Sequence, residues 1–327
     1  MTYINLILFL VVMVPWLSWL LLYFGRQNIP KNVKYFDLKK RDFYELRFEK
    51  ILHAFLSGNN TVLRFNHSIK NLQKELDKID PFYRGFAYEG AGMGYGIRST
   101  LSFNNGKKFE RDINDLFSQH IYQYYVGLGW WLHIRYGNSP NGYNKWINQM
   151  KSKLAPVVFD GVGFRSGLFR MHQIPTFTVF NETQQRICYQ GFGRSIWFTN
   201  RYNIDLVLQD LEGIDKNYLP DTFSGIGLAV AYSMFDDISL GLKIKEKIPH
   251  EFQSAFSQGM AFGWEARNLQ NQSYWNTVLN EVSDEEKRIV EEAIKVVHDI
   301  RDCIQHVDKK DYYVRWMDLT RDRITAI

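Results

Sequence analysis

The sequence predicts an all-α fold, a solenoid of about six helical hairpins behind an N-terminal transmembrane helix. Two observations predict the hairpins: an even spacing of Gly-centred segments, and stretches of helical periodicity between them. The segments begin at Gly90, Gly127, Gly161, Gly191, Gly225 and Gly259. A period of about 34 residues is typical of stacked helical hairpins, which bury their apolar faces only against their neighbours. The array is similar to tetratricopeptide arrays in shape only, since that repeat's consensus is missing.

Each Gly segment leads into an apolar stretch that fits a first helix, followed by a polar turn and a second helix. In the repeat that begins at Gly127, the second helix carries Tyr143, Trp146, Ile147 and Met150 on one face. In a later repeat the pattern starts after Asn203, a suitable N-cap. Pro220 and Pro249 stand where further first helices begin, a position that tolerates a missing N–H.

The glycines fall inside or early in these first helices, where each costs about 1 kcal/mol relative to alanine. We expect a close approach of the neighbouring helix, which a Cβ would block, to compensate for this cost. The alternative is that some Gly pairs form strand turns, notably near the β-rich run at residues 174–180. That run belongs to the short repeat that begins at Gly161, which we expect to be the least regular.

The chain divides into four parts. Residues 1–27 are expected to form a membrane anchor, 28–80 N-terminal helices, 81–282 the repeat array, and 283–327 a C-terminal capping helix. Two amphipathic helices are predicted at residues 42–56 and 68–79. The last helix begins at Ser283 with a sequence typical of a capping box.

The anchor prediction depends on Leu6–Phe24, an uncharged run long enough to cross a membrane as a helix. No basic n-region or small-residue cleavage site of a signal peptide accompanies it. Basic residues follow, from Arg26 to Arg41, which places the body of the chain on the cytoplasmic side. The alternative, a buried amphipathic helix, fits poorly with a run that is apolar all round. The expected localisation is therefore single-pass, with most of the chain in the cytoplasm.

Composition excludes several function classes. The net charge of +5 is spread along the chain, unlike the clustered basic footprint of nucleic-acid binding, so no nucleic-acid partner is expected. Cys188 and Cys303 form no CxxC or Cys/His ligand pattern, so neither a metal nor a cofactor is predicted. Aromatic residues make up 16%, enough to line a binding groove, with Trp130, Trp131 and Trp197 as candidates.

Arginines recur about eight to ten residues after the first glycine of most repeats, at equivalent solenoid positions. They are Arg98, Arg135, Arg170, Arg201 and Arg267. On one interpretation they form a ridge that binds carboxylates, phosphates or a partner, since each guanidinium offers a bidentate fork. On the other they are solvated helix ends that complement the helix dipole.

Glu89, His133 and Arg194 are the candidate catalytic residues. If Glu89 is buried, its pKa rises, which suits a general acid or base; the alternative is a structural carboxylate bonded to Arg84, Arg98 or the backbone. His133 is expected near His172, a pairing that would suit proton relay. Asp160 is expected to cap the helix near Gly161.

Several ordered motifs resemble those of the DUF1702 family. They are Tyr83–Gly94, Phe159–Phe164, Gly191–Phe198, Phe223–Ala229 and Gln258–Arg267. The last motif departs from the family pattern at Phe262, Gly263 and Trp264. The resemblance implies a bacterial protein of an enediyne polyketide cluster. Such proteins often accompany a multi-span membrane protein and an FG-GAP-repeat protein, which are therefore the expected partners.

Together these observations predict a membrane-tethered accessory or scaffold protein of a specialised polyketide pathway, in the bacterial inner membrane. Its inner face would bind a partner protein or a long apolar, acidic intermediate. Two alternatives remain: an enzyme acting on that intermediate with Glu89, His133 and Arg194, and a structural subunit of a membrane complex.

Overall fold

The structure, a computed structural model, describes residues 19–39, 42–64, 67–169 and 174–324. Every regular element in these ranges is a helix, so the all-α part of the prediction is confirmed. The long helices are α3 (Phe43–Val62), α5 (Pro81–Ser99), α7 (Ile121–Tyr136), α9 (Val158–Phe169), α10 (Glu182–Thr199), α12 (Leu219–Ser233), α14 (Gln253–Gln270), α16 (Asp284–Cys303) and α17 (Lys309–Ile324). The shorter ones are α2 (Ile29–Tyr35), α4 (Ile69–Leu76), α6 (Asn105–Asn114), α8 (Pro140–Gln149), α11 (Ile204–Gln209), α13 (Ile238–Lys247) and α15 (Gln272–Leu279).

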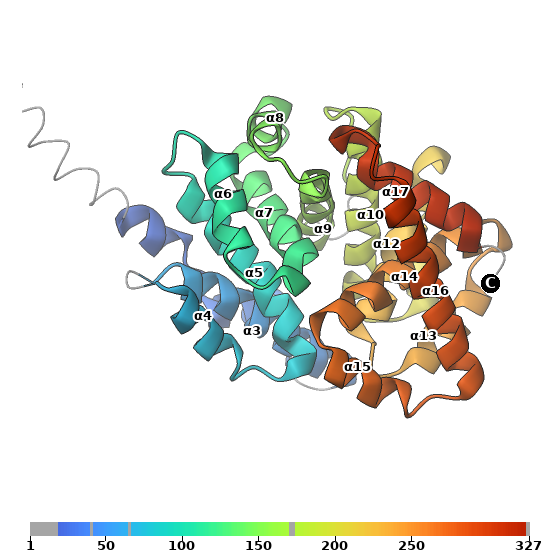
Figure 1. Ribbon diagram of the computed structural model, residues 1–327. Helices are drawn as coiled ribbons and strands as arrows, with labels where there is room; N and C mark the ends of the chain where they lie inside the picture. Colours follow the sequence, from blue (N-terminus) through green and yellow to red (C-terminus); the bar gives the residue numbers. More distant parts are fainter. Residues whose placement is uncertain (1–18, 40–41, 65–66, 170–173, 325–327) are drawn as a thin grey trace, which may run out of the picture.

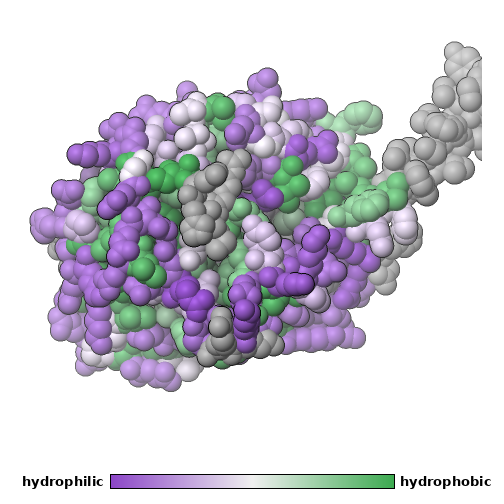
Figure 2. All heavy atoms as spheres, turned by 180° about the vertical axis from the view of Figure 1, so that it is seen from behind, coloured by the Kyte–Doolittle hydropathy of each residue, from purple (hydrophilic) through white to green (hydrophobic). Residues whose placement is uncertain are grey.

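The long helices from α3 to α14 pack side by side in chain order and form one curved row (Figure 1). A short helix follows each of them except α9 and returns the chain to the start of the next. The helix starts agree with the sequence: the Asn203 side chain caps α11, and Pro220 lies in the first turn of α12. Apolar side chains of the row form the core, whereas polar residues predominate on the face seen in Figure 2.

The glycine pairs are the contact points between neighbouring long helices. In each Gly-x-Gly pair, the first glycine lies against the backbone of the preceding long helix and the second against that of the next. A Cβ on Gly127 would collide with the carbonyl oxygen of Glu89 in α5, and one on Gly129 with that of Val158 in α9. Positions i and i+2 lie about 200° apart around a helix, so one pair serves two neighbours. The predicted close approach is confirmed.

The two ends of the row explain the irregular glycine segments. No long helix precedes α3 in the row. Its second pair position, Gly58, packs against the Ala87 backbone of α5, whereas its first pair position is Leu56 instead of glycine. In α14, the last member, Gly259 packs against the Ser224 backbone and the second position is Ala261. At these two positions of the long helices, a glycine is thus present where another long helix approaches and absent where none does.

The repeat that begins at Gly161 is the least regular, as predicted. Residues 174–180 form neither a strand nor a second helix, so the strand-turn alternative is wrong in this part of the described chain. Phe180 packs edge-on against Phe159 and Tyr143, with its ring centroid 5.2 Å from each of theirs. Ring packing therefore replaces the missing helix.

The row curves until the beginnings of its first helices meet the ends of its last ones. Arg47 in α3 donates to the Ser233 carbonyl at the end of α12, at 2.9 Å, and forms an ion pair with Asp236. Arg267 near the end of α14 donates to the carbonyl of Phe82 in α5, at 2.7 Å. The array is therefore a tight turn with an enclosed interior, and not an open solenoid with a free inner face.

Helices α16 and α17 lie across the inner side of this turn (Figure 1). Ser283 caps α16 through the predicted capping box. The single capping helix expected for residues 283–327 is instead two helices joined at residues 304–308. Lys309 of α17 donates to the carbonyls of Ile147 and Met150, at 2.8 and 2.7 Å, so this pair of helices reaches back to the middle of the row.

The predicted N-terminal transmembrane helix is not supported, and with it the single-pass inner-membrane localisation and the membrane as a partner. None of the helices in the described ranges is long and apolar enough to cross a membrane. Most of the uncharged run Leu6–Phe24 lies in residues 1–18, outside the described residues. Of its described end, Trp19, Tyr23 and Phe24 are exposed.

Candidate functional site

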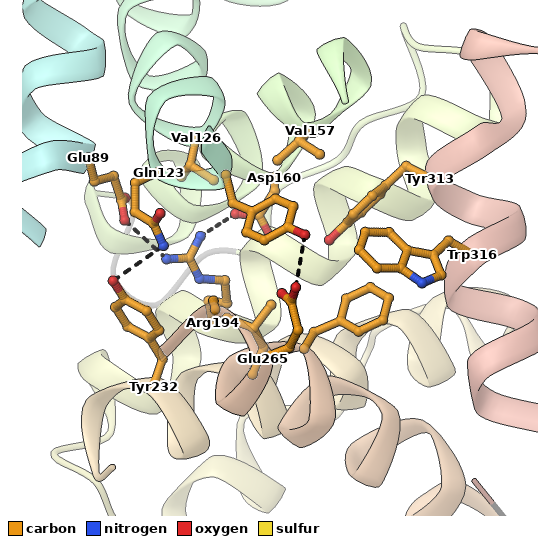
Figure 3. Close-up of a pocket in the computed structure, with 14 residues that line it drawn as sticks. Glu89, Gln123, Val126, Val157, Asp160, Arg194, Tyr232, Glu265, Tyr313 and Trp316 are labelled. Carbon is orange, nitrogen blue, oxygen red and sulfur yellow. Dashed lines mark hydrogen bonds and ion pairs between the residues drawn. The ribbon is translucent and has the colours of Figure 1, made fainter. Parts of the chain in front are cut away.

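The enclosed interior contains a cavity of about 50 Å³. It lies between the inner faces of α5, α7, α9, α10, α12 and α14 on one side and α17 on the other (Figure 3). Its lining residues are Glu89, Tyr122, Gln123, Val126, Val157, Asp160, Arg194, Leu228, Tyr232, Phe262, Glu265, Ala266, Tyr313 and Trp316. The wall is mainly apolar, and a few polar groups converge on it, which is the usual character of a ligand site.

Glu89, Asp160 and Arg194 form a buried charged triad on this wall. The guanidinium forms an ion pair with each carboxylate, through Nη1 with Asp160 and through Nη2 with Glu89 at 3.4 Å. All three side chains are almost completely buried, at 2 to 6% exposure. Arg194 also stacks on the Phe164 ring, 4.5 Å from its centroid. Three helices of the row therefore meet at one charge cluster.

Burial controls the protonation of this triad. It raises the pKa of Glu89 to about 7, against the lowering effect of Arg194, and the nearby charge of Asp160 raises it further. Burial raises the pKa of Asp160 as well, and Arg194 lowers it. The two carboxylates hold the pKa of Arg194 above its ordinary value, so the guanidinium stays charged. Near neutral pH, Glu89 is thus poised between its two protonation states.

Two carboxylate oxygens of the triad, Glu89 Oε1 and Asp160 Oδ2, accept no hydrogen bond of normal geometry. The indole N–H of Trp130, which is itself unpaired, is close enough to the Glu89 carboxyl group to lower its pKa but does not form such a bond. Buried polar atoms are nearly always paired, and leaving one unpaired costs about 1–3 kcal/mol. Both residues line the cavity, and Figure 3 shows their carboxyl groups on either side of Arg194. The arrangement is therefore suited to accept hydrogen bonds from a bound molecule.

A second carboxylate, Glu265 of α14, lies on the wall nearer α16 and α17. Its Oε1 accepts from Arg301 at 3.0 Å and from Tyr122 at 3.3 Å, and it lies 3.3 Å from His298 Nε2. Arg301 and His298 both belong to α16. This cluster therefore attaches α16 to the row beside the cavity, with the Glu265 charge balanced by Arg301.

Most of the remaining polar lining is bonded internally, although the amide oxygen of Gln123 also lacks a partner. Tyr313 of α17 donates to Gln190 Oε1 at 2.9 Å, and Gln190 donates to Ser224 at the same distance. Tyr232 Oη accepts from Gln270 at 2.7 Å and from Gln123 at 3.3 Å. These bonds fix the positions of the side chains around the triad.

Of the predicted catalytic residues, the structure brings Glu89 and Arg194 together and leaves His133 elsewhere. His133 Nδ1 lies 3.3 Å from Arg165 Nη1, and His133 does not line the cavity. Its expected neighbour His172 lies outside the described residues. Asp160 is not an N-cap as predicted: it lies inside α9 and binds Arg194.

The three candidate tryptophans pack within the row. Trp130 lies 4.6 Å from the Phe55 ring, measured between centroids. Trp131 donates to Thr100 Oγ1 at 2.8 Å, and the buried Trp197 donates to Ser233 Oγ at 3.0 Å. None of them lines the cavity, where the described tryptophan is Trp316.

The arginines of the predicted ridge have different environments. Arg98 donates to the Val62 carbonyl at the end of α3, at 3.2 Å, and Arg267 to the Tyr232 carbonyl near the end of α12, at 2.9 Å. Arg201 pairs with Asp42 and Glu45, whereas Arg135 is exposed beside the Tyr136 ring. Arg170 lies outside the described residues. Two of the five therefore bind the carboxyl ends of neighbouring helices, which complements those helix dipoles, but Arg267 is buried and not solvated as the helix-end interpretation expects.

Sequence reasoning missed a column of residues that directly precede the first glycines. They are Glu89, Val126, Asp160, Gln190, Ser224 and Gln258. All six are buried, and Glu89, Val126 and Asp160 line the cavity. Five of the six are polar or charged, which is unusual for the buried face of a helix. That pattern was available in the sequence as a signal for the site.

Fold and site define a class: a helical-repeat protein whose long helices pack through paired glycines around an enclosed, charged cavity. The chain belongs to the family described as "Protein of unknown function (DUF1702)", which it matches over residues 20–326. The resemblance seen in the motifs is thus confirmed for nearly the whole chain. No curated protein and no solved structure shows a significant match.

Proposed function

We propose that this protein is an accessory protein of a specialised polyketide pathway and binds a small ligand group in the cavity around Glu89, Asp160 and Arg194. The group is mainly apolar and ends in a hydrogen-bond donor. One observation carries the proposal. Glu89 Oε1 and Asp160 Oδ2 form no hydrogen bond, although both residues are buried on the wall of a largely apolar cavity. A donor from the ligand would remove the cost of these two unpaired acceptors.

The cavity also limits the ligand. About 50 Å³ accommodates a few water molecules or a small head group, not a long intermediate. An acidic head group would add a negative charge beside two carboxylates that share one guanidinium. We therefore revise the expected ligand from a long acidic molecule to one whose small, donor-bearing end enters the cavity.

Isolation of the protein from its native host tests the proposal. The full chain is purified under mild conditions, denatured in organic solvent, and the released small molecules are identified by mass spectrometry. We expect a donor-bearing compound in near-stoichiometric amount, and its loss from a Glu89→Gln variant of unchanged melting temperature. A Glu292→Gln variant is the matched control, since Glu292 is an exposed partner of Arg288 on α16.

If no compound is released, and none of the small alcohols and amines tested below binds, the cavity holds only water and the proposal is wrong. Equal ligand content in the Glu89→Gln variant, with product formation in the host unchanged, would place the ligand elsewhere in the protein, with the same consequence.

A second candidate function is acid–base catalysis on the bound group. The observation that favours it is the pKa of about 7 for Glu89, in a cavity where Arg194 is available to stabilise a developing negative charge. Glu89→Gln retains the shape of the side chain but cannot transfer a proton. If host cells with this variant retain ligand on the protein but stop forming product, the chain is an enzyme; if the variant loses the ligand, as the binding proposal expects, the site only binds.

A further inference from the structure

We propose that the donor held in this cavity is a protonated amine, whose positive charge balances the carboxylates of Glu89 and Asp160 together with Arg194. The inference rests on the proposed function, because it names the chemistry of the ligand at the same site.

The first argument is the charge of the cavity. Two carboxylates face one guanidinium in the triad, which leaves one negative charge unbalanced when both are ionised. On the opposite wall, Glu265 is paired with Arg301 and contacts His298, so it supplies no compensating positive charge. The remaining ionisable lining residues are Tyr122, Tyr232 and Tyr313; burial raises the pKa of each, so all are neutral.

An unbalanced charge in a buried apolar site is costly, so the site takes up a cation. When the cavity is empty, that cation is a proton. Burial raises the pKa of both carboxyl groups, and the charge of Asp160 raises that of Glu89 further, so both groups take up a proton more readily than in water. A cationic ligand would supply the same charge and allow both carboxylates to ionise.

The second argument is the number of donors that the site requires. Glu89 Oε1 and Asp160 Oδ2 both lack a partner, and they lie on either side of Arg194 (Figure 3). A primary ammonium group has three N–H donors, whereas an alcohol has one O–H. An acetate-like group has no donor when ionised. The number of donors, together with the charge of the triad, thus favours an ammonium group over an alcohol, and an alcohol over a carboxylate.

Calorimetry with three test ligands of equal heavy-atom count examines the inference: propylammonium, 1-propanol and acetate. The full-length protein is titrated in phosphate and in MES, two buffers that contain no primary amine and have different ionisation enthalpies, so that protons released on binding can be counted. We expect propylammonium to bind at least about tenfold more tightly than 1-propanol and to release up to one proton per ligand below pH 7. No binding of acetate is expected.

The pH dependence follows from the same exchange. Below the Glu89 pKa of about 7, the ammonium must displace a proton, so its affinity rises about tenfold per pH unit and then levels off. Glu89→Gln should abolish this dependence and reduce propylammonium binding at least tenfold, with little change for 1-propanol. The Glu292→Gln control should match the unmodified chain.

The possible outcomes separate the two proposals. If 1-propanol and propylammonium bind equally and no proton is released, the amine inference is overturned and the proposed donor-binding site stands. If neither ligand binds and the host protein contains no compound, both fail. A Glu89→Gln variant that retains full, pH-dependent propylammonium binding also overturns the inference. Circular dichroism confirms that each variant is folded before titration.

Discussion

The carboxylate of Glu89 and the guanidinium of Arg194 lie 3.4 Å apart in the interior, although 105 residues separate them in the chain. Their helices, α5 and α10, are not neighbours in the row. They meet because the row curves tightly enough to bring its inner faces together. Asp160, on the helix that precedes α10, completes the contact. The fold thus places a charged cluster where an open solenoid would have an exposed surface.

Removal of Arg194 should destabilise the protein strongly and in a pH-dependent way. Arg194→Met leaves two buried carboxylates without their cation, and breaking a buried ion pair in this way costs about 3–5 kcal/mol. The loss should be largest near pH 8 and smaller near pH 5, where Glu89 takes up a proton. Urea unfolding at both pH values measures it. An equal loss at both would contradict the charge argument.

Glu89 itself should make stability depend on pH. Its folded-state pKa is raised from 4.5 to about 7, so the folded chain retains a proton that the unfolded chain has released. The stabilisation is complete below pH 4.5 and is lost as pH rises through 7, a change on the order of 3 kcal/mol. The difference in unfolding free energy between the unmodified chain and Glu89→Gln, followed from pH 4.5 to 8, should show this decrease. A constant difference would mean that Glu89 is ionised throughout.

A methyl group at the helix contacts should be poorly tolerated. Gly127→Ala would place a Cβ on the Glu89 carbonyl oxygen, and the backbones of α5 and α7 would have to separate. We expect a loss of about 1–3 kcal/mol or more, despite the better helix propensity of alanine. Gly241→Ala is the matched control, since in α13 the new Cβ meets no backbone but the flexible end of Met260, at 3.0 Å, and Val230 Cγ1 at 3.6 Å. Thermal unfolding of both variants measures the two losses of stability. Equal melting temperatures would show that the glycine pairs are not required for the close contact between long helices.

Trp316 should limit the size of the ligand. Its side chain is buried, lines the cavity from α17 and donates to the Val297 carbonyl at 3.0 Å. Trp316→Ala should cost about 3–5 kcal/mol in stability and enlarge the cavity. We expect the folded variant to bind hexylammonium more tightly than propylammonium, and the unmodified chain to prefer the shorter ligand. The same preference in both proteins would show that α17 does not bound the site.

Two arginines of the repeat column should respond differently to the same substitution. Arg267 is buried and donates to carbonyls in α5 and α12, so Arg267→Met should cost at least about 1.5–3 kcal/mol. Arg135 is exposed, so Arg135→Met should change stability by less than about 0.5 kcal/mol. Chemical denaturation compares them. Similar effects would contradict the assignment of Arg267 to closure of the array.

Local signals in the sequence were sufficient to predict where the helices lie and where many of them begin. The side chains of Asn203 and Ser283 accept hydrogen bonds from backbone N–H groups and cap α11 and α16, and Pro220 lies in the first turn of α12. These features depend on neighbours a few residues away. The exception is Asp160, a good N-cap by type, which instead lies within a helix because Arg194 offers it a buried partner.

The candidate site was only partly predictable. Glu89 and Arg194 were singled out separately, but nothing in the sequence paired them, because their contact depends on the curvature of the whole row. His133, on a long helix beside Trp130 and Trp131, was an equally reasonable candidate by residue type and lies outside the cavity. Tyr122 and Glu265 were not identified at all, since each contributes through partners from distant helices.

By itself, then, the sequence determined the helical repeat, its glycine contact points and the family, because glycine spacing and helical periodicity are local and repeated. The tertiary structure alone decided which way the row curves, which polar residues meet inside it, and that α16 and α17 cover its inner side. The physical reason is that successive helices are each turned slightly relative to the one before, by an amount that depends on how closely they pack at the Gly-x-Gly pairs. This turn accumulates along the row until Glu89 reaches Arg194.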